Sequence, residues 1–494
     1  MKRRDFINAT LAGGATLTLP NAGRAASGAD RDVPAIRLSG AATVLEKAAL
    51  AELARRMRGT LILAAHPEYE QARRVWNPMI DKRPAVIARC ANAADVATAI
   101  TFARERELLL AVRSGGHSFP GLSTCDGGMM IDMSALRDVS IDTGKRTATV
   151  AAGAWVSDVD SKMQPHALAT TMGQISDTGI AGLTLGGGYG WLSRKHGLAC
   201  DNLVSVELVT PDGKIRRVSA TDNADLFWAI RGGGGNFGVA TSFVYRLHEQ
   251  KPQVYAAYIS YPIAQAREVM ELYQETTANG RRELSLDLSI EAADDGAPLV
   301  AIYACHSGDP ADGPALMAPF ELIAKPIQSA HGPSTYEQVQ HQSDGPHLSK
   351  NLHYIKAGLI TEFKPALIEL LQREFRPSNE IFIYLQNASG AVGDVAPQDT
   401  AFWNRKSMAN LMILGTWKNP AATEANRAAI RAMWEKIAPF TAGFYTNLSD
   451  AELQRDANST HRNFGDNYAR LSQLKRKYDP TNLLRLNSNI APAA

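Results

Sequence analysis

Cysteine is scarce in this chain, and its spacing excludes the usual cysteine-based sites. Only four cysteines occur in 494 residues, at Cys90, Cys125, Cys200 and Cys305, and none belongs to a C-x-x-C pair. The 11 histidines are dispersed, without the H-E-x-x-H spacing of a zinc-binding helix. The sequence therefore predicts no metal site, and it establishes no disulfide pair.

Long apolar runs and an excess of charge of one sign are missing too. No apolar run reaches the roughly 18–20 residues that cross a bilayer, so we expect no membrane span. Lys and Arg total 52 against 50 for Asp and Glu, and the basic residues are scattered, which gives no reason to expect a nucleic-acid partner. The length exceeds that of one ordinary hydrophobic core, so two domains are expected.

The first residues have the layout of an export signal. Arg3 and Arg4 precede a mildly apolar stretch over residues 7–20, and small residues dominate positions 22–27. This order is typical of a twin-arginine signal, and the low hydrophobicity of the stretch suits that route better than an ordinary secretory signal. We predict a signal peptide over residues 1–27 and a periplasmic or secreted protein.

Glycine is abundant in two informative segments. Residues 113–123 read RSGGHSFPGLS, which places His117 on a tight turn directly after an apolar strand. Gly115 and Gly116 free the backbone there, and the exposed N–H groups of such a turn can cradle phosphate oxygens. Alone, this segment also suits a strand-end turn with a hydrogen-bonded histidine. In residues 172–202, however, six further glycines lie among apolar residues, which indicates that a large group approaches the backbone closely.

Four segments in order resemble one enzyme family. They are residues 113–123, 172–202, 224–239 and 478–490. The chain is similar, over roughly residues 70–490, to proteins with the PCMH-type FAD-binding domain of the vanillyl-alcohol-oxidase superfamily, and more narrowly to the berberine-bridge-enzyme-like branch. The resemblance implies an FAD-linked oxidoreductase. It also implies an α+β fold, in which a two-lobed FAD-binding domain joins a substrate domain with a large antiparallel sheet backed by helices.

The resemblance to this family implies domain boundaries for the whole chain. The FAD-binding domain is expected over residues 28–250, with its core at about 82–248, the substrate domain over 251–449, and a returning C-terminal segment over 450–494. In the substrate domain, alternation and apolar periodicity predict strands at 254–261, 284–291, 299–305, 354–360, 381–386 and 408–417, and helices at 263–277, 315–322, 365–374 and 420–437.

One competing motif is excluded by its surroundings. Residues 233–238 satisfy G-x-G-x-x-G, a fingerprint that requires a strand before it and a helix after it. Here a short helical pattern at 225–230 precedes the glycines and an alternating strand at 239–247 follows them. A Rossmann-type NAD site is therefore not expected, and these glycines are expected to wrap the flavin.

The resemblance also implies how FAD is held. His117 would be joined covalently to the flavin 8α-methyl group. Many relatives add a cysteine before the GGG run, but alignment on Gly173 and Gly179 puts Ile175 there, so a single covalent bond is predicted. For His196 a packing role is the alternative. The remaining expected FAD contacts are Arg113, Ser114, Gly115, Gly116, Ser118 and Ser123 around the pyrophosphate, and Thr178, Gly179, Gly182, Gly188, His196, Asn202, Val239, Asn487 and Asn489 elsewhere.

Four residues are candidates for the substrate chemistry. Hydride transfer from an alcohol carbon becomes easier when a base removes the hydroxyl proton. Relatives place that base on a substrate-domain strand, or use a tyrosine in an aromatic pair where this chain has Asn463 and Phe464, a departure that weakens the tyrosine mechanism. Packing is the alternative role for each tyrosine. The candidates are Tyr384 and Gln386, which share one strand face, Tyr189 and Tyr468.

The expected activity is hydride transfer from a small alcohol or sugar-like substrate to flavin. Oxidation of a C–N or C–C bond in an amine or alkaloid is the first alternative, and a catalytically silent flavin-binding protein is the second. The electron acceptor is dioxygen or a quinone- or cytochrome-type carrier. Ile180 stands where oxidases of the family commonly carry valine, which favours a dehydrogenase.

Overall fold

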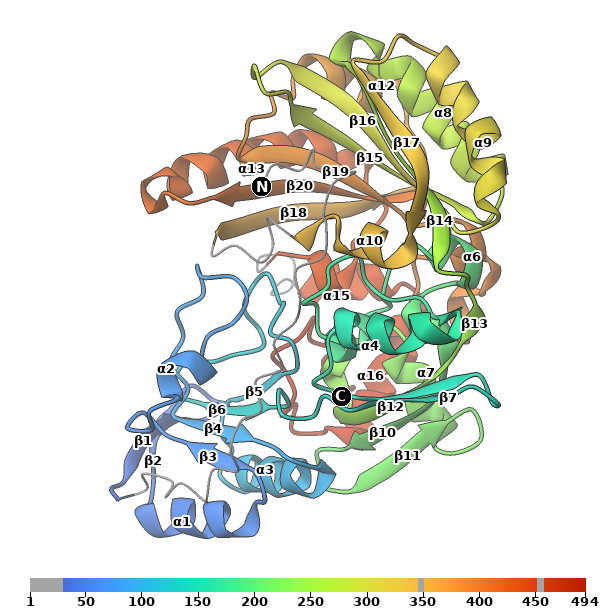
Figure 1. Ribbon diagram of the computed structural model, residues 1–494. Helices are drawn as coiled ribbons and strands as arrows, with labels where there is room; N and C mark the ends of the chain where they lie inside the picture. Colours follow the sequence, from blue (N-terminus) through green and yellow to red (C-terminus); the bar gives the residue numbers. More distant parts are fainter. Residues whose placement is uncertain (1–29, 345–350, 451–456) are drawn as a thin grey trace.

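The computed structural model describes residues 30–344, 351–450 and 457–494. The predicted signal peptide therefore lies outside the described residues. Figure 1 shows a large sheet with its helices stacked above two smaller sheets, and the chain passes from the lower part to the upper part and back again.

The upper part is built on a seven-stranded sheet of order β17-β14-β16-β15-β19-β20-β18, in which every neighbouring pair is antiparallel. Four helices cover its outer face (Figure 1). This confirms the predicted α+β architecture. The elements are β14 (Gln253–Pro262), β15 (Leu284–Ala292), β16 (Pro298–His306), β17 (Gln328–Thr335), β18 (Leu352–Ile360), β19 (Ile381–Asn387) and β20 (Ala409–Trp417), with α8 (Ala266–Asn279), α9 (Gly313–Leu322), α12 (Pro365–Arg373) and α13 (Thr423–Ile437).

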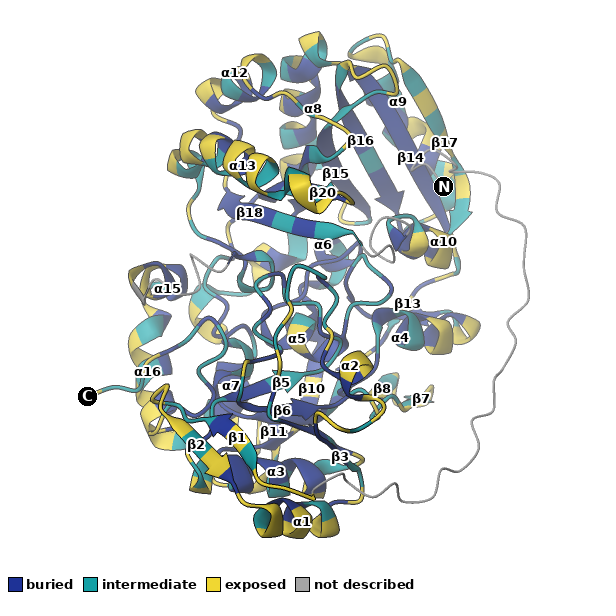
Figure 2. Ribbon diagram, turned by 90° about the vertical axis from the view of Figure 1, so that its left-hand side faces the viewer, coloured by how far each residue is buried: buried dark blue, intermediate teal, exposed yellow. Residues whose placement is uncertain are grey.

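Both faces of this sheet are covered, and Figure 2 shows its inner strands almost wholly buried. Along β15, Leu284, Leu286, Leu288 and Ile290 pack with the helices, because strand side chains alternate between faces. The alternate residues, 285, 287 and 289, are two serines and an aspartate. A polar row of the sheet is thus buried on the side that faces the lower part.

The lower part has two lobes. One lobe holds a five-stranded antiparallel sheet of order β11-β10-β12-β8-β7. The other lobe holds a four-stranded sheet of order β3-β4-β6-β5, in which β4 and β5 run parallel to β6. The strands are β3 (Thr60–Ile62), β4 (Val86–Arg89), β5 (Leu110–Arg113), β6 (Met129–Asp132), β7 (Val139–Asp142), β8 (Thr147–Ala151), β10 (Leu203–Val209), β11 (Ile215–Ser219) and β12 (Val239–Arg246), and the short pairs are β1 (Val33–Ile36) with β2 (Ala42–Leu45) and β9 (Leu168–Ala169) with β13 (His248–Glu249).

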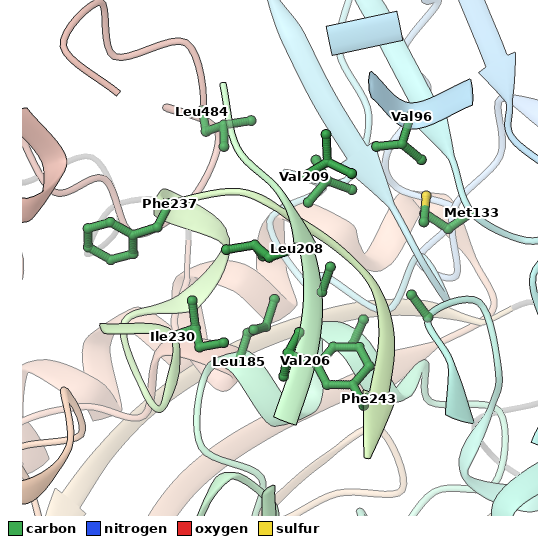
Figure 3. Packing of buried hydrophobic residues seen from close by; sticks show 14 of the residues in the cluster. Val96, Met133, Leu185, Val206, Leu208, Val209, Ile230, Phe237, Phe243 and Leu484 are labelled. Carbon is green, nitrogen blue, oxygen red and sulfur yellow. The ribbon is translucent and has the colours of Figure 1, made fainter. Parts of the chain in front are cut away.

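A shared core joins the two lobes. Helix α3 (Ala93–Glu105) contacts β6 of one lobe and β10 and β11 of the other. Figure 3 shows Val96 of this helix in one cluster with Met133, Val206 and Leu208. The other α-helices in the described residues are α1 (Lys47–Arg56), α2 (Tyr69–Ala72), α4 (Val156–Met163), α5 (Ile180–Leu185), α6 (Ser193–His196), α7 (Ala224–Ile230), α10 (Tyr336–His341), α15 (Ala457–Phe464) and α16 (Asn467–Tyr478).

The C-terminal helix α16 packs against α7 of the lower part. Leu471, Leu474 and Leu484 belong to the same core cluster as the two lobes. Inside this region Lys475 and Asp479 form a fully buried ion pair, with Nζ 2.7 Å from Oδ2. The last residues are therefore an integral layer of the lower part.

The predicted strands and helices of the substrate domain are present within a few residues of their expected ends. Strand β17 was not predicted, because Gly332 and Pro333 disfavour a strand in the sequence. It lies at the edge of its sheet, where a residue without an N–H group is tolerated. Around the G-x-G-x-x-G segment, α7 comes first and β12 follows, so the predicted order is confirmed and no Rossmann arrangement forms there.

Candidate active site

A cavity of about 360 Å³ lies where the two lobes meet the polar side of the large sheet. Its walls come from the turn after β5, the loop that leads into α5, the glycine turn after α7, the tail around residue 487, and strands β19 and β20. Fourteen residues expected at the site line this one cavity: Ser114, Gly115, Gly116, His117, Ser118, Ser123, Thr178, Gly179, Gly182, Tyr189, Val239, Tyr384, Gln386 and Asn487.

Two of the glycines bring backbone segments into direct contact. A Cβ atom on Gly179 would lie 2.3 Å from the amide nitrogen of Gly115, and one on Gly115 would lie 2.4 Å from the nitrogen of Gly179. Gly116 has a φ of +73°, in the left-handed region that other residues rarely adopt. The histidine turn is therefore docked against the start of α5, and only glycine permits this approach.

Gly182 is different, because a Cβ atom there would meet nothing within 4 Å. It lies inside α5 and faces the cavity, although glycine in a helix costs about 1 kcal/mol relative to alanine. Nearby, Ser123 Oγ, Tyr189 Oη and Gln386 Oε1 are buried without a hydrogen-bond partner in the described part of the chain. Buried polar atoms are normally paired. Open space beside the glycine, and lining residues with polar groups that lack partners, fit a large polar cofactor.

His117 is held rigidly at the cavity wall. Its Nε2 lies 3.1 Å from Asp177 Oδ1, and its ring stacks on Trp76 with the centroids 4.3 Å apart. On the other face of Trp76, His353 stacks at 4.2 Å, and Asn77 donates a 2.9 Å hydrogen bond to the His353 carbonyl oxygen. The histidine turn is thus fixed against strand β18 of the large sheet.

Six of the expected site residues lie outside the cavity lining: Arg113, Gly188, His196, Asn202, Asn489 and Tyr468. The Arg113 guanidinium bonds to the Asp132 carboxylate at 3.1 Å and to the Ala72 carbonyl at 2.6 Å, so its side chain supports the turn from behind. A Cβ atom on Gly188 would lie 2.5 Å from Cβ of Ala199, so this glycine serves close packing.

The other four have packing contacts of their own or lie behind the wall. The His196 ring stacks on His248 at 3.8 Å, and burial lowers the pKa of His196 to about 3, so it stays neutral. Asn202 donates to the carbonyl oxygens of His196 and Leu198 and lies 2.6 Å from His248 Nε2. Tyr468 stacks on His461 at 4.2 Å on the surface of α15 and α16. Asn489 lies in the C-terminal tail, beyond the lining residues Asn487 and Ser488.

A hydrogen-bonded network forms the wall that the large sheet contributes. Tyr384 donates to Asp287 Oδ2 at 2.7 Å, Gln174 Nε2 donates to the same oxygen at 2.7 Å, and the Asn387 N–H donates to Oδ1 at 2.8 Å. Gln386 Nε2 in turn donates to Gln174 Oε1 at 2.7 Å. The loop before α5 is therefore tied to β15 and β19 through side chains alone.

Sequence reasoning missed Asp287, Gln174 and Tyr445. Asp287 carried a detectable signal, since it is a carboxylate within the alternating strand LSLDLSI. Tyr445 lines the cavity, and its Oη accepts from the Gly188 N–H at 3.0 Å and from Asn447 Nδ2 at 2.7 Å. The sequence does not show these two contacts. The contact with Gly188 joins positions 257 residues apart, and the contact with Asn447 depends on the local turn.

Two further findings concern the described residues only. No helix among them combines the length and the apolar character that a membrane crossing demands. Within the same ranges, no group of three or more histidine, cysteine or acidic side chains is arranged to hold a metal ion. All four cysteines are buried as free thiols, and none of them lines the cavity.

The chain is similar to known proteins over most of its length. Residues 84–219 match the family described as FAD binding domain, and residues 444–491 match the family described as berberine and berberine like. An FAD-linked oxidoreductase of Dictyostelium discoideum is 30% identical over 448 residues, covering 89% of this chain and 96% of the relative. (R)-6-hydroxynicotine oxidase of Paenarthrobacter nicotinovorans is 26% identical, with 88% and 97% covered. The solved structure of a chitooligosaccharide oxidase superposes with a TM-score of 0.80 at 22% identity, covering 90% of this chain and 100% of that one.

The fold and the cavity define an FAD-binding oxidoreductase. The chain belongs to the berberine-bridge-enzyme-like family of FAD-linked oxidoreductases, in the vanillyl-alcohol-oxidase superfamily. The glycine cradle and His117 line the cavity, so the residues present fit a bound FAD.

Proposed function

We propose that this protein is an exported oxidoreductase that carries FAD covalently on His117 and takes a hydride from a small alcohol or sugar-like substrate. One observation carries the proposal: His117 and the glycine cradle form one wall of the cavity, and Tyr384 and Gln386 form the facing wall. Bound FAD supplies the two-electron chemistry, and the protein positions the substrate and receives its proton.

The surroundings of His117 support a covalent bond. The Asp177 carboxylate beside Nε2 favours the tautomer with the proton on Nε2, and in that tautomer the lone pair on Nδ1 is the nucleophile. Stacking on Trp76 fixes the orientation of the ring. Ile175 lines the cavity where relatives carry a second attachment residue, and its side chain has no nucleophilic atom. The proposal is therefore a single attachment.

Replacing His117 with alanine is expected to abolish covalent attachment. Flavin fluorescence should remain with the denatured wild-type chain on an acrylamide gel and disappear from the His117→Ala variant. The matched control is His196→Ala, because His196 lies outside the cavity and its variant should keep the flavin. Flavin that separates from the denatured wild type would show that His117 makes only a noncovalent contact.

Export is proposed on the strength of Arg3 and Arg4. In a bacterium with the twin-arginine pathway, the Arg3→Lys and Arg4→Lys double variant should stay in the cytoplasm, while the wild type is recovered outside it with a new N-terminus near residue 28. Equal distribution of the two proteins between compartments would contradict this proposal. The flavin content of both proteins should be the same, because the signal precedes the described fold.

The acceptor is proposed as dioxygen or a quinone- or cytochrome-type carrier. Ile180 is fully buried in the core of the lower part and is not among the residues that line the cavity. Its position therefore does not support a role in controlling the access of oxygen to the flavin. Amine oxidation is the second candidate reaction, because one relative is named for a hydroxylated nicotine. Flavin reduction by amines and by alcohols under nitrogen separates these two candidates.

A further inference from the structure

The loop before α5 carries the carboxylate that faces His117. Asp177 Oδ1 lies 3.1 Å from His117 Nε2, so the place of this carboxylate decides which ring nitrogen holds the proton. Residues 173–178 form neither a helix nor a strand. The position of Asp177 therefore depends on contacts that neighbouring elements make with the loop.

The residue before Asp177 is held by the end of α10. The Ser176 N–H donates to Asp344 Oδ1 at 3.0 Å, and Ser176 Oγ lies 2.7 Å from His341 Nδ1. The same histidine nitrogen lies 2.6 Å from Asp344 Oδ2. Helix α10 lies between the large sheet and the lower part (Figure 1). Asp177 is thus tied to the upper part of the molecule through its neighbour in the chain.

The surroundings of His341 favour its charged form. The hydrogen bond to Asp344 raises the pKa of His341. Burial opposes the charge on Asp344, but the hydrogen bonds from His341 and Ser176 outweigh it and hold the pKa of Asp344 below its usual value. The other acidic groups near His341 are Glu337, 4.0 Å from Nε2, and Asp160 on α4, whose pKa burial raises to about 7. His341 and Asp344 therefore stay an ion pair over a wider range of pH than an isolated histidine would allow.

Residues 340–344 contact the loop and the cavity in turn. Gln340 Nε2 donates to the Gly173 carbonyl oxygen at 3.0 Å and to Asp160 Oδ2 at 2.9 Å, so the start of the loop is held as well. Gln342 and Ser343 line the cavity. The side chains that hold the loop therefore also fix the place of this part of the cavity wall.

We propose, resting on the covalent attachment proposed above, that His341 and Asp344 are positioning residues for that attachment. They act through Ser176, which sets the place of Asp177 beside the histidine ring. A displaced Asp177 no longer favours the proton on His117 Nε2, and the attachment becomes slower. Noncovalent binding of FAD makes no such demand on the histidine.

The attachment step balances with groups already named. Nδ1 of His117 bonds to the 8α-carbon, one C–H bond of that methyl group breaks, and the Nε2–H proton is released toward Asp177. The electron pair of the C–H bond reduces the flavin ring, which takes up two protons in place of the two released. The acceptor proposed above, dioxygen or a quinone- or cytochrome-type carrier, then removes the two electrons.

The test follows flavin in the full-length chain purified at several times after induction. Absorbance gives the total bound flavin, and fluorescence on a denaturing gel gives the covalent share. Asp344→Ala should bind as much flavin as the wild type, but covalent flavin should appear about 10–10²-fold more slowly, because a displacement of about 1 Å can cost a rate this much. Ser176→Ala should slow attachment less, since it keeps the backbone N–H bond to Asp344.

Asp177→Asn separates positioning from a general loss of stability. Alone it should slow attachment, and the addition of Asp344→Ala should slow it little further, because residues that act as a unit are not additive. Slowing factors that multiply in the double variant, or a loss of total bound flavin in place of slower attachment, would show that Asp344 has only a structural role.

Glu321→Ala is the matched control. Glu321 Oε1 lies 3.1 Å from His331 Nε2, and Tyr255 Oη lies 2.6 Å from His331 Nδ1, so this cluster also joins a histidine, a carboxylate and a hydroxyl group. None of the three lines the cavity, and the variant should attach flavin at the wild-type rate. Attachment at the wild-type rate in Asp344→Ala, or equal slowing in Glu321→Ala, overturns the assignment. Flavin that leaves the denatured wild-type chain instead refutes the covalent attachment itself, and the wild-type gel reports this separately.

Discussion

A Gly182→Val variant is expected to fold and to lose at least about tenfold of its affinity for flavin. The glycine lies in α5 with open cavity space where a side chain would begin, so valine would occupy volume that the cofactor needs. A tenfold loss corresponds to about 1.4 kcal/mol of binding free energy, a modest demand for an isopropyl side chain added in the space that the cofactor needs. The readout is the ratio of flavin to protein absorbance after purification, together with thermal unfolding of the apo-protein.

Gly179→Val provides the contrasting variant three residues earlier. Its Cβ atom would lie 2.3 Å from the nitrogen and 2.6 Å from the Cα atom of Gly115, so backbone must move. This chain should fail to fold or unfold at a clearly lower temperature, even without cofactor. If Gly182→Val retained the wild-type flavin content, the cofactor would not occupy the space beside α5.

The glycines of the cavity show how much of the site the sequence could predict. Gly115, Gly179 and Gly182 were all expected at the flavin site from their motifs, and all three line the cavity. Their roles could not be told apart, because the sequence does not show which glycine touches backbone and which touches ligand. That distinction depends on how the turn after β5 docks on α5, a contact between segments more than 60 residues apart.

The residues that lie outside the cavity show a second limit. His196 and Asn202 follow the glycine run closely in sequence, yet both belong to a packed cluster with His248. These residues lie in helical turns of only four residues, too short for a period of 3.6 to show in the sequence. A motif there predicts that a residue is near the site, but it does not predict the direction of its side chain. Tyr384 and Gln386 were assigned correctly to one face, because they lie on a strand with a regular alternation.

Asp287 was missed for a different reason. Its strand was predicted over residues 284–291, but the polar residues that alternate along it do not show whether that face meets solvent or another part of the protein. The fold buries that face against the lower part, which turns a single aspartate into a buried charge. Which face of a sheet meets solvent is decided by domain packing, and a strand pattern alone does not contain it.

Breaking the ion pair between Asp201 and Arg405 is expected to lower the stability of the fold strongly. Arg405 is fully buried, and its two terminal nitrogens lie 2.7 and 2.9 Å from the two Asp201 oxygens. The remaining donors reach Thr400 Oγ1 and the Phe402 carbonyl oxygen. Asp201→Ala leaves this guanidinium buried without its counter-charge, which costs about 3–5 kcal/mol in the free energy of unfolding.

The pair also connects the upper part of the molecule to the glycine loop. Arg405 fixes Phe402, which lies so near Gly187 and Gly232 that a Cβ atom on either would come within 3.0 Å of it. Asp201→Ala should therefore reduce flavin binding as well as the denaturation midpoint in urea. Pairing Asp201→Ala with Arg405→Met should recover part of the lost stability, because an apolar side chain of similar length carries no buried charge.

Arg282 and Asp394 supply the matched control for this experiment. They form the same two-pronged arrangement, at 2.7 and 3.0 Å, but their side chains are 48% and 62% exposed. Asp394→Ala should cost less than about 1 kcal/mol, since water solvates the released arginine and screens the pair. Equal losses in Asp201→Ala and Asp394→Ala would mean that burial of the guanidinium is not what makes the inner pair important. A loss confined to Asp201→Ala would show that Arg405 is costly to bury without the Asp201 charge.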